Sequence, residues 1–271
     1  MQFSVLLSLY YKENSEYLRQ SLDSIFNQTL KPDEVVLVED GPLTTELYKV
    51  VDEYAKRFSI IKIIPLEKNG GLGNALNIGL AHCSFDLVAR MDTDDIAKPD
   101  RFEKEIAVFE KDPTIDCCGS WIDEFIDIPS HVVSQRKVPE HNDEIIKYAH
   151  SRCPVNHPTV MYSKSMVQSV GGYQGFPEDY FLWIKMIMAG AKFYNIQSSL
   201  LFFRFSNDVI KRRGGMSYAR DCIRTQYGFY KAGFNSLFEF LKNCIIRCTI
   251  SMIPNNFRSF IYRKFLRDHV K

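Results

Sequence analysis

The sequence lacks the patterns that would place the chain across a membrane or in a secretory pathway. None of its 271 residues belongs to an uninterrupted apolar run near the roughly 18 residues that a spanning helix needs. The opening segment, MQFSVLLSLYYKE, has neither a basic region nor a cleavage site, so we expect no signal peptide there. We therefore expect a protein that does not cross a membrane.

The seven cysteines follow no disulfide or metal-binding spacing. No C-x-x-C pair occurs, and the cysteines are scattered along the chain apart from the adjacent pair Cys117–Cys118. An odd count without a pattern favours reduced thiols in the cytoplasm over a disulfide framework.

Glycine is missing where two common nucleotide-binding motifs need it. The first predicted strand runs into SLYYKEN, which contains no glycine, and no GxxxxGK[ST] segment occurs in the chain. These absences argue against a nicotinamide dehydrogenase of the Rossmann type and against a P-loop NTPase.

The net charge of +1 hides a strong asymmetry. Residues 211–271 carry 13 Lys and Arg against 3 Asp and Glu, a balance of +10, which leaves −9 for the residues before them. This split predicts an acidic catalytic body with a basic tail that binds an anionic partner, either a membrane surface or a nucleic acid.

Strand and helix patterns alternate four times in the first part of the chain. The expected strands cover 3–9, 34–38, 60–64 and 86–89, and the expected helices cover 15–28, 44–58, 72–81 and 101–110, with Ser15 as the first N-cap. Such alternation predicts an α/β fold with a mostly parallel sheet and helices on both of its faces.

The pattern loosens after residue 115. We expect strands over 116–122, 134–138, 192–196 and 200–205, and helices over 143–150 and 181–189, the latter closed by Gly190. Residues 152–179 form a long segment rich in Pro, Gly and aromatic residues, which favours a functional loop. The expected domains are a catalytic domain over 1–213, with halves 1–115 and 116–213, and a helical tail over 214–271.

Three carboxylates follow the fourth strand within four positions. Asp92, Asp94 and Asp95 repel one another unless a cation or polar ligand lies among them. Oxygen ligands suit Mg²⁺ or Mn²⁺, ions that usually bind with the phosphates of a substrate. The alternative is a simple turn with a helix N-cap, a common setting for Asp.

Further polar segments fall at the same predicted sheet edge. Asp40 follows the second strand, where it either contacts a base or ribose or belongs to the β-turn that Asp-Gly-Pro favours. Residues 68–73 (KNGGLG) resemble a phosphate cradle, although their glycines would also let the next helix approach closely.

Two acids precede the apolar helix near residue 181. Glu178 and Asp179 are favoured at a helix start by the backbone dipole, or they supply a general base for an incoming hydroxyl. His157, in NHPT, is by itself best explained as a capped loop histidine.

Taken in order, several segments resemble bacterial family 2 glycosyltransferases of the GT-A fold. The resemblance is greatest to enzymes that build O-antigen, capsule and amylovoran-type exopolysaccharide units. No single segment is specific, but the ordered set is. It covers the chain to about Arg213 and comprises residues 3–13, 16–29, 33–42, 69–80, 90–101, 156–162, 170–173 and 178–183.

The resemblance implies a role for each matching residue. Asp94 and Asp92 would bind Mn²⁺ or Mg²⁺, and Asp179 would be the catalytic base. The residues that would contact the nucleotide sugar are Ser8, Tyr10, Glu13, Asp40, Asn69, Gly71, Asn77, Asp92, Thr93 and Asp95. On the acceptor side would lie His157, Glu178 and Trp183, the last packing against the acceptor sugar or supporting the base.

The resemblance also implies the reaction. An inverting transferase would move a hexose, Glc or Gal, from a UDP-sugar to a lipid-linked acceptor such as GlcNAc-diphospho-undecaprenol, and would form a β-linkage. The enzyme would act as a peripheral protein at the cytoplasmic face of the bacterial inner membrane. Two departures stand out: Leu76 replaces an Arg of many relatives, and residues 203–208 lack the metal-binding His of some.

The tail has amphipathic spacing. One apolar stripe includes Leu237, Leu241, Ile245 and Cys248, and a second falls within residues 257–265 among Arg and Lys. Basic helices of this kind suit an anionic bilayer, unless they simply pack on the catalytic domain and expose their charges. No motif that reads nucleic acid is present, so we expect no nucleic-acid partner.

Two other functions remain compatible with these features. A sugar nucleotidyltransferase shares the sheet and the paired acids, but it should have a glycine-rich loop after the first strand. A non-catalytic scaffold that binds a UDP-sugar and recruits pathway partners needs no base at Asp179.

Overall fold

The computed structural model describes residues 1–205, 214–254 and 257. Its sheet has the strand order β3, β2, β1, β4, β8, β6, β9 and β5, with β7 paired to β6. The strands are β1 (Phe3–Leu9), β2 (Glu34–Glu39), β3 (Ile61–Pro65), β4 (Leu87–Arg90), β5 (Ile96–Ala97), β6 (Cys117–Phe125), β7 (Val132–Arg136), β8 (Met161–Ser163) and β9 (Phe193–Arg204). The helices are α1 (Ser15–Phe26), α2 (Thr45–Arg57), α3 (Leu72–His82), α4 (Arg101–Lys111), α5 (Asn142–Ala149), α6 (Lys164–Ser169), α7 (Glu178–Met188), α9 (Gly215–Lys231) and α10 (Leu237–Met252).

The first four strands form the parallel half of the sheet that the sequence predicts. Strand β1 lies between β2 and β4, and β3 pairs with the outer side of β2, all in parallel. Parallel strands place their carboxyl ends at one edge, so the segments after β2 and β4 open onto the same side of the molecule.

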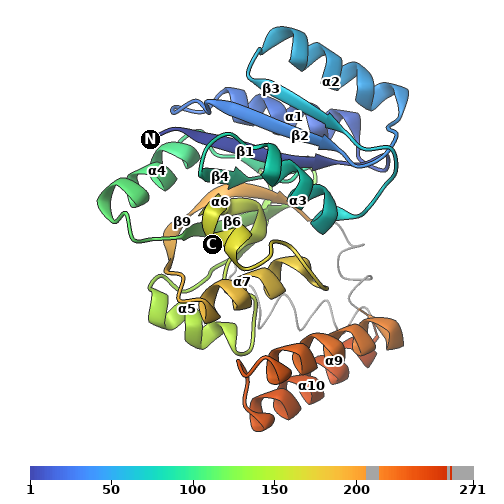
Figure 1. Ribbon diagram of the computed structural model, residues 1–271. Coiled ribbons are helices and arrows are strands. Elements are labelled where there is room, and N and C mark those ends of the chain that lie inside the picture. The colour runs from blue at the N-terminus through green and yellow to red at the C-terminus, as the bar shows by residue number, and fades with distance from the viewer. Residues whose placement is uncertain (206–213, 255–256, 258–271) are drawn as a thin grey trace.

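Helices cover both faces of this half, as expected (Figure 1). Side chains of β1 alternate between the faces: Leu6 belongs to a core shared with α3 and α7. Val5 and Leu7 belong to a second core shared with α1, α2 and α4. Burial of β1 on both faces accounts for its continuous apolar sequence.

The second half of the sheet is mostly antiparallel. Strand β8 pairs antiparallel with β4 and with β6, whereas β9 runs parallel to β6. The two final strands expected over 192–196 and 200–205 are wrong as separate elements, because β9 is continuous. The register against β6 shifts between Ser120 and Trp121, which face Ile196 and Ser199, so the polar residues 197–198 form an irregularity within one strand.

Two local expectations also need correction. Asn14, not Ser15, caps α1, because its side-chain oxygen accepts hydrogen bonds from the backbone amides of Glu16 and Tyr17. The segment 152–179 is not a continuous loop, since it contains β8 and α6. Gly190 ends α7 with φ +87, as the sequence predicts.

The described part of the tail is a helical hairpin, α9 and α10, that packs on the catalytic body below α7 in Figure 1. Among the described residues, no helix combines the length and apolar character that a membrane crossing requires. The second apolar stripe, expected over 257–265, lies almost wholly outside the described residues, as do residues 206–208 of the segment that lacks a His.

Candidate active site

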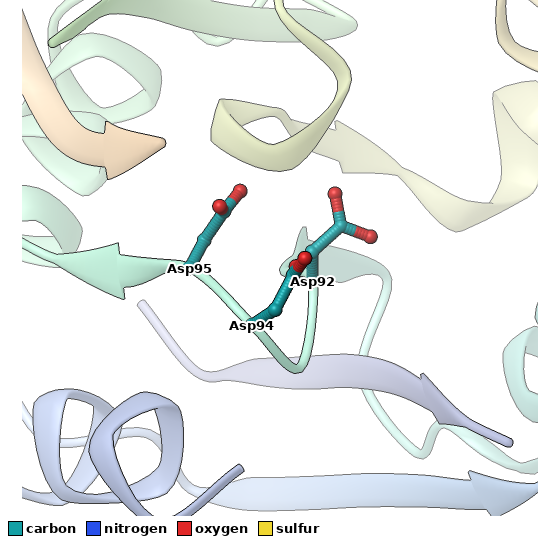
Figure 2. A group of neighbouring side chains, drawn as sticks. All are labelled: Asp92, Asp94 and Asp95. Atoms are coloured by element: carbon teal, nitrogen blue, oxygen red, sulfur yellow. The ribbon is translucent and has the colours of Figure 1, made fainter. Parts of the chain in front are cut away.

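The acidic turn lies between β4 and β5, at the carboxyl edge of the parallel strands. Figure 2 shows Asp92, Asp94 and Asp95 with their carboxylates on the same side of this turn. One oxygen from each lies within 4.8 Å of the others. The sheet therefore brings the three expected acids into one cluster.

Each acid of the cluster has a different surrounding. The guanidinium of Arg90, which is 1% exposed, donates to both oxygens of Asp92, one at 2.7 Å. Asp95 accepts the backbone amide of Arg204 at 2.9 Å through Oδ1, and its buried Oδ2 has no hydrogen-bond partner among the residues that the structure describes. Asp92 is thus neutralised within the protein, whereas Asp95 keeps a free oxygen.

The electrostatics of the cluster favour an added cation. Burial, together with the charges of Asp92 and Glu13, raises the pKa of Asp94 to about 7. Burial also raises the pKa of Asp95, with Asp94 and Asp92 contributing. The unpaired buried oxygen and the raised pKa values fit a hard divalent cation. Such a cation would bind the unpaired oxygen and stabilise the ionised form of the carboxyl groups.

Arg204 fastens the acidic turn, and sequence reasoning gave it no role. Its Nε donates to the backbone oxygen of Asp94 at 2.9 Å and its Nη2 to Gln20 at 2.7 Å. The guanidinium lies 3.7 Å from the ring centre of Tyr17 and 4.6 Å from that of Phe125. It thus joins β9, α1 and β6 to the turn, a link between distant segments that no local motif signals.

The loop after β1 reaches the same turn. Thr93 Oγ1 donates to Glu13 Oε2 at 3.2 Å and to the backbone oxygen of Ser8 at 3.4 Å. Burial raises the pKa of Glu13. Tyr10 is 38% exposed, so it can reach a ligand from solvent. Four of the expected nucleotide-sugar residues therefore lie together beside the acidic cluster.

Asp40 anchors the glycine segment before α3. Its Oδ1 accepts the amide of Gly70 at 2.7 Å and its Oδ2 that of Gly71 at 3.1 Å, while Asn69 donates to its backbone oxygen at 3.1 Å. At Gly41, φ is +85 and an added Cβ would lie 2.5 Å from the amide nitrogen of Asn69. The Asp-Gly turn and the glycine segment are therefore one unit, held by both carboxylate oxygens of Asp40, and contact of Asp40 with a base or ribose stays a prediction.

A pocket of about 510 Å³ opens between the start of α3 and the loop before α7. Asn77 holds the two sides together. Its side-chain nitrogen donates to the backbone oxygen of Tyr173, and its side-chain oxygen accepts from the backbone amide of Tyr173, both at 2.8 Å. The lining residues are Gly70, Gly71, Leu72, Gly73, Asn74, Asn77, Tyr173, Gln174, Gly175, Phe176 and Glu178. The expected glycine segment and the expected acceptor residue Glu178 thus share one cavity.

Glu178 and Asp179 begin α7, where backbone amides face them. Burial raises the pKa of Glu178, and Asp179 and Asp92 raise it further. Cys153, which the sequence did not single out, places its Sγ 3.6 Å from Asp179 Oδ2.

The other two expected acceptor residues lie beneath the surface. Trp183 has none of its surface exposed, and its ring packs against those of His157 and Tyr162. His157 is 9% exposed, and its Nε2 lies 3.1 Å from the Tyr173 hydroxyl. Burial lowers the pKa of His157. Packing of Trp183 against an acceptor sugar does not fit, because the indole is fully buried; support of the base Asp179, from the same helix, stays a prediction.

Leu76, the first of the two departures expected from the resemblance, is also fully buried. It belongs to the core between the sheet and α3, with α7 on the same face. A charged side chain could not replace it there without large rearrangement, because an unpaired buried charge is costly.

A glycosyl transferase family 2 model matches residues 4–169 of the chain, which contain the acidic turn and the glycine segment. The chain belongs to this family. As a family 2 glycosyltransferase it is an enzyme that transfers a sugar, in accord with the resemblance described above.

Two curated relatives match this family 2 glycosyltransferase over nearly its whole length. The Escherichia coli protein named UDP-Gal:alpha-D-GlcNAc-diphosphoundecaprenol beta-1,3-galactosyltransferase is 42% identical over 98% of this chain and 97% of its own. The amylovoran biosynthesis glycosyltransferase AmsE of Erwinia amylovora is 38% identical over 97% of this chain and 98% of its own. The expected relation to O-antigen and exopolysaccharide enzymes is confirmed.

Solved structures confirm the GT-A fold. The mannosyltransferase PcManGT of Pyrobaculum calidifontis, in complex with GDP-Man and Mn²⁺, superposes with a TM-score of 0.64 at 16% identity, covering 91% of this chain and 69% of its own. Staphylococcus aureus TarS 1–349 in complex with UDP-GlcNAc gives 0.61 at 18% identity, covering 84% and 66%.

Proposed function

We propose that this family 2 glycosyltransferase moves galactose, or else glucose, from its UDP-sugar to GlcNAc-diphospho-undecaprenol, with inversion to a β-linkage. The observation that carries the proposal is the shared carboxyl edge of β4, which leads into the acidic turn, and β2, which leads into Asp40 and the glycine segment bonded to it. That glycine segment lines one pocket with Glu178 at the start of α7. The choice of donor and acceptor rests on the 42% identity to the E. coli galactosyltransferase over 98% of the chain.

The acidic turn would hold the diphosphate end of the donor. Asp94 and the free oxygen of Asp95 would bind a divalent cation, Mn²⁺ or Mg²⁺. Asp95 here takes the place of Asp92, the second ligand that the resemblance implies, because Arg90 already pairs with both oxygens of Asp92. Bound there, the cation would neutralise the charge that develops on the departing UDP. The loop of Ser8, Tyr10 and Glu13 would face the nucleoside.

Asp179 would act as the catalytic base. It accepts the proton of the acceptor hydroxyl while that oxygen attacks the anomeric carbon, and the bond from that carbon to the diphosphate oxygen breaks. Attack from the side opposite to UDP inverts the anomeric centre. Glu178, whose pKa burial raises, lines the pocket in which the acceptor sugar would sit.

The tail 214–271 would bring the enzyme to its lipid-linked acceptor at the cytoplasmic membrane face. Support comes from its balance of 10 basic against 3 acidic residues, which suits an anionic bilayer.

The direct test supplies UDP-Gal, UDP-Glc and UDP-GlcNAc in turn, with a GlcNAc-diphospho-lipid and Mn²⁺. We expect transfer from UDP-Gal above the others, a loss of about 10²–10⁴-fold in kcat for Asp179→Asn, and no transfer in excess EDTA. Asp143→Asn is the matched control, because Asp143 occupies the same first-turn position in α5, away from the site.

Each outcome discriminates between explanations. Activity that survives Asp179→Asn would remove the base assignment, and full turnover in EDTA would remove the metal. UDP binding without transfer of any sugar would support the scaffold, and formation of a UDP-sugar from UTP and a sugar phosphate would support the nucleotidyltransferase.

A further inference from the structure

The outer helix of the tail hairpin, α10, turns most of its large apolar side chains outward, although Phe240 is half-buried and stacks on Tyr230 of α9. The buried residues of α10 are polar, Asn243 at 5% and Ser251 at 1% exposure. Large apolar side chains point into solvent instead, with Phe238 75% and Ile245 67% exposed. The full exposed set, which we call the outer face, is Leu237, Phe238, Leu241, Ile245, Ile246 and Met252.

Hydrogen bonds fix α10 in this orientation. Asn243 donates to the backbone oxygen of His150 at 2.7 Å and to Gln226 at 2.9 Å, and Arg247 donates to the backbone oxygen of Ser151 at 2.8 Å. Rotation of the helix to bury its apolar side would leave these buried polar groups without partners, which is costly. The apolar side chains of the outer face therefore stay available for an external partner.

We propose that the outer face of α10 is the surface that inserts into an anionic lipid bilayer. The choice of a bilayer rests on the proposed function, because that function requires a lipid-linked acceptor. The charges fit this partner: Lys242 is exposed beside Leu241, and Lys231 is exposed at the end of α9. Arg224 of α9 also presents 81% of its side chain to solvent, where it pairs with Asp221 at 3.7 Å. Apolar side chains flanked by Lys and Arg are typical of helices that lie in the interface plane.

The hairpin is also in contact with the catalytic pocket. Thr225 of α9 donates to the backbone oxygen of Phe176 at 2.7 Å, and Phe176 lines the pocket beside Glu178. A hairpin bound to the bilayer would hold the pocket at a fixed distance from the membrane surface, where the diphosphate and sugar of the acceptor project.

The test measures flotation of the full chain with vesicles of phosphatidylcholine, with and without phosphatidylglycerol. We expect binding to the anionic vesicles, and a loss of about 100-fold in partitioning for Phe238→Ser with Ile245→Ser, tenfold for each side chain. Lys242→Gln should cost about fivefold on the anionic vesicles and nothing on neutral ones. Ile128→Ser with Met188→Ser is the matched control, since these side chains are 58% and 49% exposed on the catalytic body.

Binding of the Phe238/Ile245 variant that equals wild type would overturn the proposal. A second outcome would also overturn it: the wild type forms a dimer in lipid-free solution, and the Phe238/Ile245 variant loses the dimer but still binds vesicles. The outer face would then join two copies of the chain. Sugar transfer to a short-chain, water-soluble acceptor needs no membrane, so this assay tests the proposed function separately from the bilayer surface. If that transfer is absent while vesicle binding behaves as expected, the proposed function fails and the bilayer surface stands.

Discussion

Replacing Arg90 by Gln should destabilise the fold and make its stability depend on a divalent cation. The guanidinium is 1% exposed and pairs with both oxygens of Asp92, and it opposes the raised pKa of Asp94 and Asp95. Without it, three carboxylates face one another with no buried positive side chain bonded to them.

The size of the effect follows from burial. Breaking a buried ion pair costs roughly 3–5 kcal/mol, and the lower end applies here because 30% of the Asp92 side chain is exposed and can rehydrate. A loss of about 3 kcal/mol corresponds to a fall of roughly 6–12 °C in Tm for a chain of about this size. Saturating Mn²⁺ should recover more Tm in the variant than in wild type, since the cation supplies the missing charge.

The assay is thermal unfolding in EDTA and in Mn²⁺. Arg19→Gln is the matched control, because Arg19 makes the same two-bond contact with Glu53 at the surface, where such pairs contribute about 0–1 kcal/mol. If both variants unfold within about 2 °C of wild type in EDTA, the electrostatic account of the acidic turn is wrong.

Three further predictions concern the same site. Relative to Asp94→Asn, the metal-free wild type should lose stability as pH rises from about 4 to 7, because the folded pKa of Asp94, about 7, exceeds the unfolded value of roughly 3.9. Denaturant unfolding in EDTA measures this difference, and its absence would contradict the prediction. Asp95→Asn should stabilise the metal-free protein, because it removes a buried charge with an unpaired oxygen, and it should abolish stabilisation by Mn²⁺. Both effects are measured as changes in Tm, and retained stabilisation by Mn²⁺ would exclude Asp95 as a ligand. Asn77→Ala should cost about 1–3 kcal/mol by leaving the Tyr173 amide and carbonyl without partners, and should raise the KM for sugar substrates. Lys49→Ala, at an exposed position of α2 outside the pocket, should change neither.

The sequence determined the parallel half of the fold and the place of the acids on it. Buried parallel strands read as continuous apolar runs, and β1, β2 and β4 all show this pattern, so the four β/α repeats were predictable. The cluster of Asp92, Asp94 and Asp95 follows directly from its position after β4, because parallel strands end at a common edge.

Elements that depend on distant pairing could not be read locally. Strand β8 has three residues and β5 two, too short for any periodic pattern, and they exist because β4, β6 and β9 supply hydrogen-bond partners. The polar residues 197–198 look like a strand end in the sequence, yet pairing with β6 continues across them.

Tertiary structure alone decided how the charges of the site are balanced and which side of the tail faces outward. Arg204 meets the acidic turn from β9, 110 positions after Asp94, so this contact appears as no spacing in the chain. Arg90 stands only two residues before Asp92, but that its guanidinium turns back to this carboxylate is seen only in the structure. The sequence showed an apolar stripe on α10 but not its direction. Hydrogen bonds of Asn243 to α9 and to the body turn the polar side inward, because a buried amide must be paired, and leave the stripe exposed.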